Sequence, residues 1–232
     1  MHSLSRLSSL LALILFCLQP AAARTIAMIG TGDVGSALGV ALAEHGHTIV
    51  YGSRNPDRDS VRELVARTGG EASAGTQADA AQQADIVVLA IPPHVVEDTV
   101  RGLGELDGKI IVDPTNPMRL VAGRFERTTE LSNTELIQAA APDAQVVKAF
   151  STVTWQTMLD PDTSAGPISV PLAGNDENAK TQVAELVTQL GLEPIDLGDA
   201  RDARWIEGML LLWINNRFSE RPAFEFHLRR IE

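Results

Sequence analysis

Short apolar runs alternate with segments of helical periodicity along most of this chain. The apolar run at residues 25–29 is followed by apolar positions at helical spacing over 34–42 and by a second run at 48–51. The same two patterns return as buried strands at 85–91, 109–112 and 145–149 and as helices at 59–68 and 94–106. Continuous apolar strands that alternate with helices predict an α/β fold, a doubly wound Rossmann-type parallel sheet.

The second part of the chain predicts a small C-terminal α/β extension. Strands are expected at 168–172 and 194–197, a helix at 177–190 and a final helix from about Arg201. The final helix is unusually apolar, so we expect it to pack either into the body or across a partner; the second arrangement would be a homodimer through the C-terminal helix. The expected domain boundaries are 24–150 for the Rossmann domain and 151–232 for the extension.

Two stretches carry no prediction of a helix or strand. Residues 118–129 are interpreted as a polar connection, and residues 78–84 as a low-complexity stretch of Ala and Gln. Ser132 and Glu135 have the spacing of a capping box, which predicts a helix that ends near Ala141.

The end of the first predicted strand carries the G-x-G-x-x-G sequence Gly30-Thr31-Gly32-Asp33-Val34-Gly35. Between a strand and a helix, Gly30 permits the tight turn, Gly32 lets a pyrophosphate approach the backbone, and Gly35 lets the helix pack closely on the strand. The phosphate then lies at the helix N-terminus. The motif and its flanking elements predict a dinucleotide-binding crossover.

The residues after the second predicted strand indicate which dinucleotide binds. NAD-binding units usually place an Asp or Glu about 20 residues after the glycine motif to hold the ribose 2′-hydroxyl. This chain instead has Ser53, Arg54 and Arg58. A guanidinium donates two parallel hydrogen bonds to a phosphate, whereas a carboxylate repels it. We therefore expect NADP as the cofactor, with Arg58 either on the phosphate or on the exposed side of the next helix.

Composition and charge narrow the classes of partner. The chain has 232 residues and a formal net charge of −11, which disfavours nucleic acid and anionic membrane surfaces. Its one cysteine, Cys17, lies close to the N-terminus. We therefore expect neither disulfides nor a metal site in the folded domain.

The first 23 residues have the pattern of a secretory signal peptide. A short polar start is followed by an apolar run over 10–18 and by Ala21 and Ala23, small residues suited to cleavage after Ala23. The run is shorter than the roughly 20 residues of a membrane span, so no stable span is expected. We expect an exported or periplasmic protein if this leader is used, and a cytoplasmic protein otherwise.

Five motifs occur together, in this order: the glycine motif, Gly52-Ser53-Arg54, Ala90-Ile91-Pro92-Pro93, Thr115-Asn116-Pro117 and Lys148-Ala149-Phe150-Ser151-Thr152. From about residue 24 to residue 218 the chain resembles the deazaflavin-dependent NADP reductases, the family that uses coenzyme F420. The resemblance implies an NADPH-dependent oxidoreductase that passes hydride directly between the nicotinamide and a small-molecule acceptor, a deazaflavin (F420) or flavin-like compound.

The same resemblance implies roles for individual positions. Thr31, Ser53, Arg54 and Arg58 match the family positions that hold the adenosine phosphate. Three further residues match backbone positions beside the nicotinamide end, namely Ala90, Ile91 and Pro93. The acceptor of the family lies between these strand ends and the C-terminal part of the chain.

Two other functions remain open at this point. One is the NADPH-dependent reduction of a small imine or carbonyl compound, which needs a proton donor such as His94 or Tyr51; the other is a non-enzymatic NADP-binding module. No catalytic residue is assigned beyond the candidate His94, because hydride transfer between stacked rings needs positioning and exclusion of water. Asn116 is expected to contact the carboxamide or to fix its loop, and Lys148 to act as a counter-ion or to pack near the acceptor.

Overall fold

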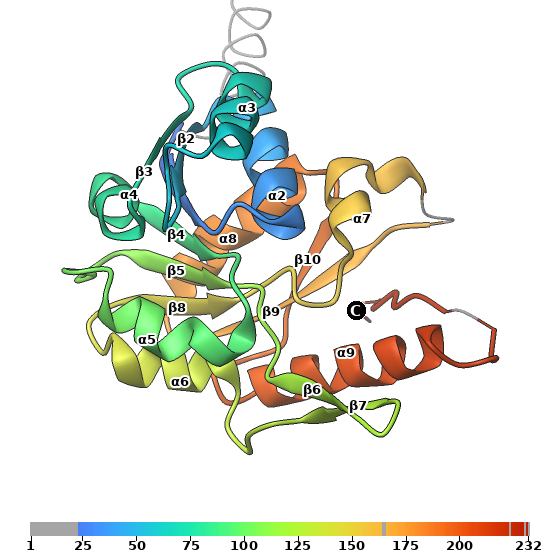
Figure 1. Ribbon diagram of the computed structural model, residues 1–232. Helices are drawn as coiled ribbons and strands as arrows, with labels where there is room; N and C mark the ends of the chain where they lie inside the picture. The colour runs from blue at the N-terminus through green and yellow to red at the C-terminus, as the bar shows by residue number, and fades with distance from the viewer. Residues whose placement is uncertain (1–22, 164–165, 223, 230, 232) are drawn as a thin grey trace, which may run out of the picture.

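The computed structural model describes residues 23–163, 166–222, 224–229 and 231, so the predicted leader, apart from Ala23, lies outside the described residues. The strands of its main sheet are β1 (Thr25–Ile29), β2 (Thr48–Gly52), β3 (Ser73–Gly75), β4 (Ile86–Leu89), β5 (Ile110–Asp113), β8 (Gln145–Lys148), β9 (Ser169–Gly174) and β10 (Glu193–Asp196). They form one eight-stranded sheet in the order β10-β9-β8-β5-β4-β1-β2-β3 (Figure 1).

Strand direction divides this sheet into two parts. From β3 to β8 every neighbouring pair is parallel, whereas β9 runs antiparallel to β8 and β10 runs parallel to β9. The strands of the C-terminal extension therefore continue the sheet of the Rossmann domain. The chain order reverses between β1 and β4, which is the switch point where open α/β sheets bind ligands at the carboxyl ends of their strands.

Helices cover both faces of the sheet, which confirms the predicted doubly wound fold. On one face lie α2 (Asp33–Glu44), α3 (Asp59–Thr68) and α8 (Glu177–Gln189), and on the other lie α4 (Gln77–Gln83), α5 (Val96–Arg101) and α6 (Asn133–Ala140). Each face has its own buried apolar cluster, because strands covered on both sides bury every side chain.

The prediction of a polar connection at 118–129 is wrong. The structure forms a hairpin of β6 (Met118–Val121) and β7 (Arg124–Arg127), whose turn holds Ala122 and Gly123 at positive φ. Arg119, Arg124 and Glu126 are exposed and no residue of the two strands is fully buried, so the sequence shows no buried strand pattern. The hairpin is held instead by the final helix, α9 (Ala203–Arg217), whose Asn215 side chain exchanges two hydrogen bonds of 2.8 Å with the Phe125 backbone.

The Ala/Gln stretch also proves to be structured. It forms α4, which Thr76 caps by accepting a hydrogen bond from the Asp79 backbone, and Ala80 and Ala81 are fully buried. Ala and Gln have high helix propensity, and small residues allow a helix to lie close to the sheet. The helix expected at 94–106 is shorter than predicted, since a 3₁₀ turn, η2 (Pro93–Val95), precedes α5.

The final helix α9 packs on the body with one side only. Ala203 and Ile206 join Ala173 of β9 in a small buried cluster, whereas Trp205 is 72% and Leu212 is 65% exposed. The chain before β9 contains the short helix α7 (Trp155–Leu159) and the turn η3 (Pro161–Thr163), and α7 packs against α2. Among the described residues, we find no helix of the length and apolarity needed to cross a membrane.

Candidate functional site

The glycine motif forms a close-packed turn between three strands. Gly30 has φ of +111°, donates a backbone hydrogen bond of 3.0 Å to Gly52 at the end of β2, and leaves no space for a Cβ, which would lie 2.1 Å from the Ala90 carbonyl oxygen. A Cβ on Gly35 would lie 2.1 Å from the Gly30 carbonyl oxygen. These two glycines are therefore required by the protein's own packing.

Gly32 differs from them, because a Cβ at this position would meet no protein atom within 4 Å. It is the exposed N-cap of α2 with φ of −81°, a conformation open to other residues. No side chain caps this helix end, and Asp33 and Val34 form its first turn. The open space at Gly32 and the helix N-terminus fit the pyrophosphate of a dinucleotide.

Two of the predicted phosphate-binding side chains are in contact. Arg58, the N-cap of α3, donates a hydrogen bond of 3.2 Å from Nη2 to Thr31 Oγ1, so it does not simply point away into solvent. Ser53 is buried at the end of β2, where its hydroxyl accepts from the Asn55 amide, and Arg54 is exposed beside it. The carboxyl end of β2 thus presents two guanidinium groups next to the glycine turn, a fit for a 2′-phosphate.

The other predicted cofactor residues lie along the same edge of the sheet. Ala90 and Ile91 follow β4, Pro93 begins η2, and Asn116 follows β5. The Asn116 amide donates to the Ser151 carbonyl oxygen at 3.2 Å, which joins the loops after β5 and β8. We call the loops that follow β1, β4, β5 and β8 the cofactor edge.

The two candidate proton donors occupy different environments. Tyr51 is fully buried; its hydroxyl hydrogen-bonds Thr68 Oγ1 at 2.8 Å and lies under Gly39 of α2, away from the cofactor edge. Burial raises the pKa of Tyr51, although Thr68 and Arg67 act against this. His94 lies exposed in η2. Of the two, only His94 could reach a ligand at the surface.

A buried ionic cluster lies behind the cofactor edge. Lys148 at the end of β8 contacts Asp113 Oδ2 of β5 at 2.6 Å and Glu207 Oε1 of α9 at 2.9 Å, and the three side chains are at most 1% exposed. Burial alone would lower the pKa of Lys148, but the two carboxylates outweigh it and raise this pKa. Lys148 is therefore held as a cation.

From the sequence, Lys148 was expected to act as a counter-ion or to pack near the acceptor, and neither carboxylate was identified. Glu207 lies in an apolar helix between Ile206 and Met209. An isolated acid in such a helix is the sequence feature that could have identified Glu207 as a buried charge. Asp113 closes an apolar strand in the same way. Their partner could not be identified from the sequence, because the three residues come from distant segments.

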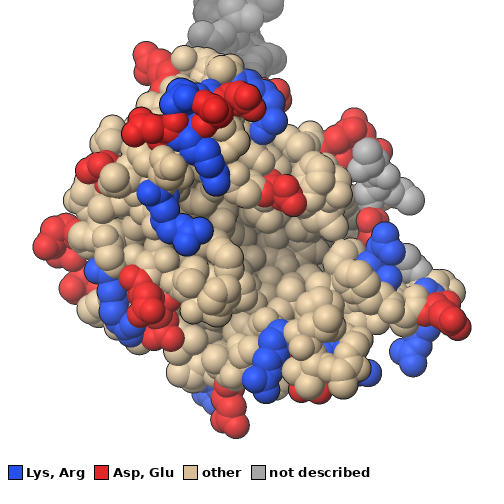
Figure 2. Space-filling view, in the orientation of Figure 1, with Lys and Arg blue, Asp and Glu red and all other residues tan. Residues whose placement is uncertain are grey.

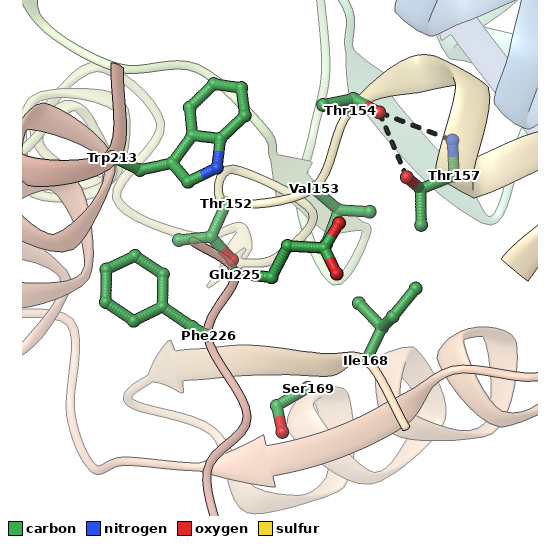
Figure 3. A pocket seen from close by; sticks show the side chains of 9 residues that line it. All are labelled: Thr152, Val153, Thr154, Thr157, Ile168, Ser169, Trp213, Glu225 and Phe226. Atoms are coloured by element: carbon green, nitrogen blue, oxygen red, sulfur yellow. Dashed lines mark hydrogen bonds between the residues drawn. The ribbon is translucent and has the colours of Figure 1, made fainter. Parts of the chain in front are cut away.

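A crevice lies between the loop after β8, β9, α9 and the C-terminal tail. Figure 3 shows the residues that line it: Trp213 of α9 and Glu225 and Phe226 of the tail lie on one side, and Thr152, Thr154 and Thr157 lie on the other. Its volume is about 30 Å³. This is room for a water molecule or two, whereas ligand pockets measure roughly 300–1,000 Å³.

A wider depression lies beside this crevice. Figure 2 shows that the molecule is hollowed between the part that contains α2 and the part that contains α9, and that this hollow is largely free of charged side chains. An uncharged, concave surface suits a flat aromatic ring system. It is therefore a better fit for a ligand than the crevice.

Comparison with known proteins shows the family. A family model described as NADP oxidoreductase, coenzyme F420-dependent, matches residues 25–117. The F420-dependent NADP reductase of Methanocaldococcus jannaschii is 31% identical over 209 residues, covering 83% of this chain and 92% of that protein. Human metalloreductase STEAP2 is 32% identical over 190 residues, covering 81% of this chain and 36% of that protein.

Structural comparison leads to the same family. A crystal structure provisionally described as an F420-dependent NADP reductase from Arthrobacter sp. FB24 matches with a TM-score of 0.77 at 34% identity, covering 83% of this chain and 93% of that one. The glycine turn and the guanidinium pair described above fit the NADP that this family uses. The chain therefore belongs to the coenzyme F420-dependent NADP oxidoreductase family and is an NADP-dependent oxidoreductase.

Proposed function

We propose that this protein transfers hydride directly between NADPH and a deazaflavin or flavin-like acceptor. The observation that carries the proposal is the similarity to an F420-dependent NADP reductase along 83% of this chain and 92% of that protein. Direct hydride transfer depends on orientation and exclusion of water, so this reaction does not require His94, the candidate proton donor at the cofactor edge, to act as an acid or base.

In this proposal the chain's residues bind and orient the two reactants. When bound, the nicotinamide ring of NADPH supplies the hydride. Arg54 and Arg58, with Thr31 and Ser53, hold the 2′-phosphate, and the glycine turn accepts the pyrophosphate against the N-terminus of α2. The loops after β4 and β5 then hold the nicotinamide end, and the uncharged hollow holds the acceptor beside it.

Stopped-flow absorbance with NADPH deuterated at C4 tests the reaction. With an oxidised deazaflavin or flavin we expect NADPH oxidation, a deuterium isotope effect and deuterium in the reduced acceptor, with chelator present and no covalent intermediate. His94→Ala should lower the rate only modestly, since no proton donor is required. Tight NADPH binding without oxidation by a deazaflavin or a flavin would contradict the proposal.

The alternative outcomes are separable in the same experiment. Reduction of a small imine or carbonyl compound, with a large loss of rate in His94→Ala, would favour that class of reductase. NADPH binding with no acceptor of any kind would favour a binding module. Human STEAP2 is named a metalloreductase, so an oxidised metal chelate belongs among the acceptors tested.

We also propose that two copies associate through α9. Trp205, Met209 and Leu212 follow one another at helical spacing, and the first and last are largely exposed. An apolar stripe of this kind is typical of an interaction surface. Size-exclusion chromatography with light scattering should give a dimer that Leu212→Arg converts to a monomer; a monomeric unmodified protein would contradict the proposal.

A further inference from the structure

The buried ionic cluster of Asp113, Lys148 and Glu207 joins three elements that are distant in sequence. Asp113 ends β5, Lys148 ends β8, and Glu207 lies in the first half of α9. Glu207 also accepts a hydrogen bond of 2.9 Å from the Asn133 backbone at the start of α6, and Arg127 of β7 approaches it at 3.3 Å. The cluster thus fastens the final helix and the hairpin to the carboxyl ends of two central strands.

Stability alone is a weak reason for such a cluster. Removing charges from water costs several kcal/mol per ion, and apolar residues of similar volume often stabilise a protein as well or better. Lys180 of α8 illustrates the ordinary case, since it pairs with Asp196 and with Glu177, which is 83% exposed at the surface. A lysine with two fully buried carboxylates is better suited to fixing one particular arrangement of elements.

The arrangement that it fixes is the loop after β5. Asp113 Oδ1 accepts hydrogen bonds from both the backbone amide and the hydroxyl of Thr115, at 2.9 and 2.6 Å. Lys148 donates to the Thr115 carbonyl oxygen at 2.7 Å. All three polar groups of Thr115 are therefore held by the cluster, and the next residue is Asn116.

Asn116 and Ser151 present unsatisfied polar atoms at this point. The Asn116 amide donates to the Ser151 carbonyl oxygen, yet Asn116 Oδ1 and Ser151 Oγ are buried without a hydrogen-bond partner in the described part of the chain. Ser151 is only 5% exposed. Buried polar atoms are paired in most native structures, so an unpaired acceptor and an unpaired hydroxyl on two residues that hydrogen-bond each other point to a polar group that arrives from outside.

The backbone between Lys148 and Ser151 is strained. Phe150 has φ of +61°, an unfavourable value for a bulky residue, and its side chain is buried. Such a conformation persists only where the surrounding structure enforces it, and it is frequent at ligand sites. Lys148, two residues earlier, is anchored at three points and supplies that enforcement.

We infer that the buried ionic cluster is a positioning device: through Lys148 it holds Asn116 and Ser151 at the cofactor edge, where they orient the carboxamide of the nicotinamide for hydride transfer. This inference rests on the proposed function. A carboxamide offers both a donor for Asn116 Oδ1 and a carbonyl oxygen for the Ser151 hydroxyl. Lys148 is a positioning residue and touches neither reactant.

Lys148→Met, with Lys180→Met as the matched control, tests the inference. A displacement of about 1 Å at a reacting centre costs up to roughly a hundredfold in rate, so we expect the single-turnover rate of hydride transfer at saturating NADPH to fall at least about tenfold in Lys148→Met. The Kd for NADPH should change by less than about threefold, since the phosphate contacts remain. Lys180→Met should leave both values unchanged.

An unchanged single-turnover rate in folded Lys148→Met would overturn the inference, because a merely structural lysine alters stability and not the rate per folded molecule. If Lys148→Met does not fold, Glu207→Gln carries the same test, since it removes one charge and keeps the shape and the acceptor for Asn133.

Hydrogen exchange separates a failure of this inference from a failure of the proposed function. NADPH should protect residues 30–36 in the unmodified protein, in Lys148→Met and in Glu207→Gln, but should protect residues 113–118 in the unmodified protein only. This readout needs no acceptor, so it remains valid if hydride transfer to a deazaflavin fails. Equal protection of 113–118 in unmodified and variant proteins would overturn the inference.

Discussion

At the scale of single residues, the glycines of the motif meet two different requirements, close packing of the fold and space for the ligand, which the sequence pattern does not distinguish. Gly30 and Gly35 are needed by the fold, because a Cβ on either would collide with a carbonyl oxygen. Gly32 is not needed by the packing of the fold, since its Cβ would point into free space, and we expect that only the ligand requires it. Substitutions at these positions should therefore have different effects.

Gly32→Val should abolish NADPH binding and leave the unfolding temperature of the free protein close to that of the unmodified protein. The backbone at Gly32 tolerates a side chain, but that side chain occupies the space of the pyrophosphate. Gly35→Ala is the contrasting control and should lower the unfolding temperature. Calorimetry and titration measure both effects; undiminished NADPH binding by Gly32→Val would contradict the assignment.

Arg54 is predicted to determine the preference for NADPH over NADH. A charge-assisted bidentate hydrogen bond contributes about 1.5–3 kcal/mol, so NADPH should bind at least about tenfold more tightly than NADH, and Arg54→Ala should remove most of this difference. Arg67→Ala, at the other end of α3, is the control. Equal affinities of the unmodified protein for the two cofactors, measured by titration, would refute the prediction.

At the scale of elements, α6 and α9 are joined by a capping residue. Glu135 accepts a hydrogen bond from the Ser132 backbone in the predicted capping box, which the structure confirms, and also contacts Arg204 Nε of α9 at 2.6 Å. Desolvation opposes ionisation of Glu135, but Arg204 and the two Ser132 donors outweigh it and lower its pKa to about 2. The Glu135 carboxylate therefore caps the N-terminus of α6 and also binds α9 to it.

This lowered pKa predicts how stability depends on pH. The folded-state pKa lies below the ordinary value of 4.5, so the stabilisation is complete above that value and is lost as the pH falls toward about 2. Between pH 5 and pH 3 we expect the unfolding free energy of Glu135→Gln to fall less than that of the unmodified protein. The variant lacks the carboxylate that takes up about one proton on unfolding in this range. Urea unfolding at several pH values measures the slope.

Glu97→Gln is the matched control for this measurement. Glu97 forms an exposed ion pair with Arg101 on α5, and exposed pairs contribute little to stability. Its slope should therefore follow that of the unmodified protein. Identical slopes for Glu135→Gln and the unmodified protein would contradict the role of Glu135.

At the scale of the whole molecule, β1 begins at Thr25, close to the predicted cleavage point after Ala23. If the leader is removed as expected, the mature protein begins at Arg24 and loses no part of the sheet. N-terminal sequencing of protein from fractionated host cells should find Arg24 first, in the exported fraction. Soluble cytoplasmic protein that begins at Met1 would refute export.

The strand, glycine turn and helix at residues 25–44 were predictable from the sequence because their physical causes are local. A strand, a glycine turn and a helix follow one another within about twenty residues, and glycine has the backbone freedom that this turn requires. The capping box of α6 and the helix at 59–68 were predictable for the same reason. In each case the residues that determine the structure are neighbours along the chain.

Tertiary structure alone decided the features that join distant segments. Asn215 of α9 binds the backbone of the hairpin of β6 and β7, and β9 joins the sheet antiparallel to β8. Lys148 meets Asp113 and Glu207 only in the folded chain. A sequence pattern records whether a residue is suited to burial, but the partner of a buried charge is chosen by how the elements pack.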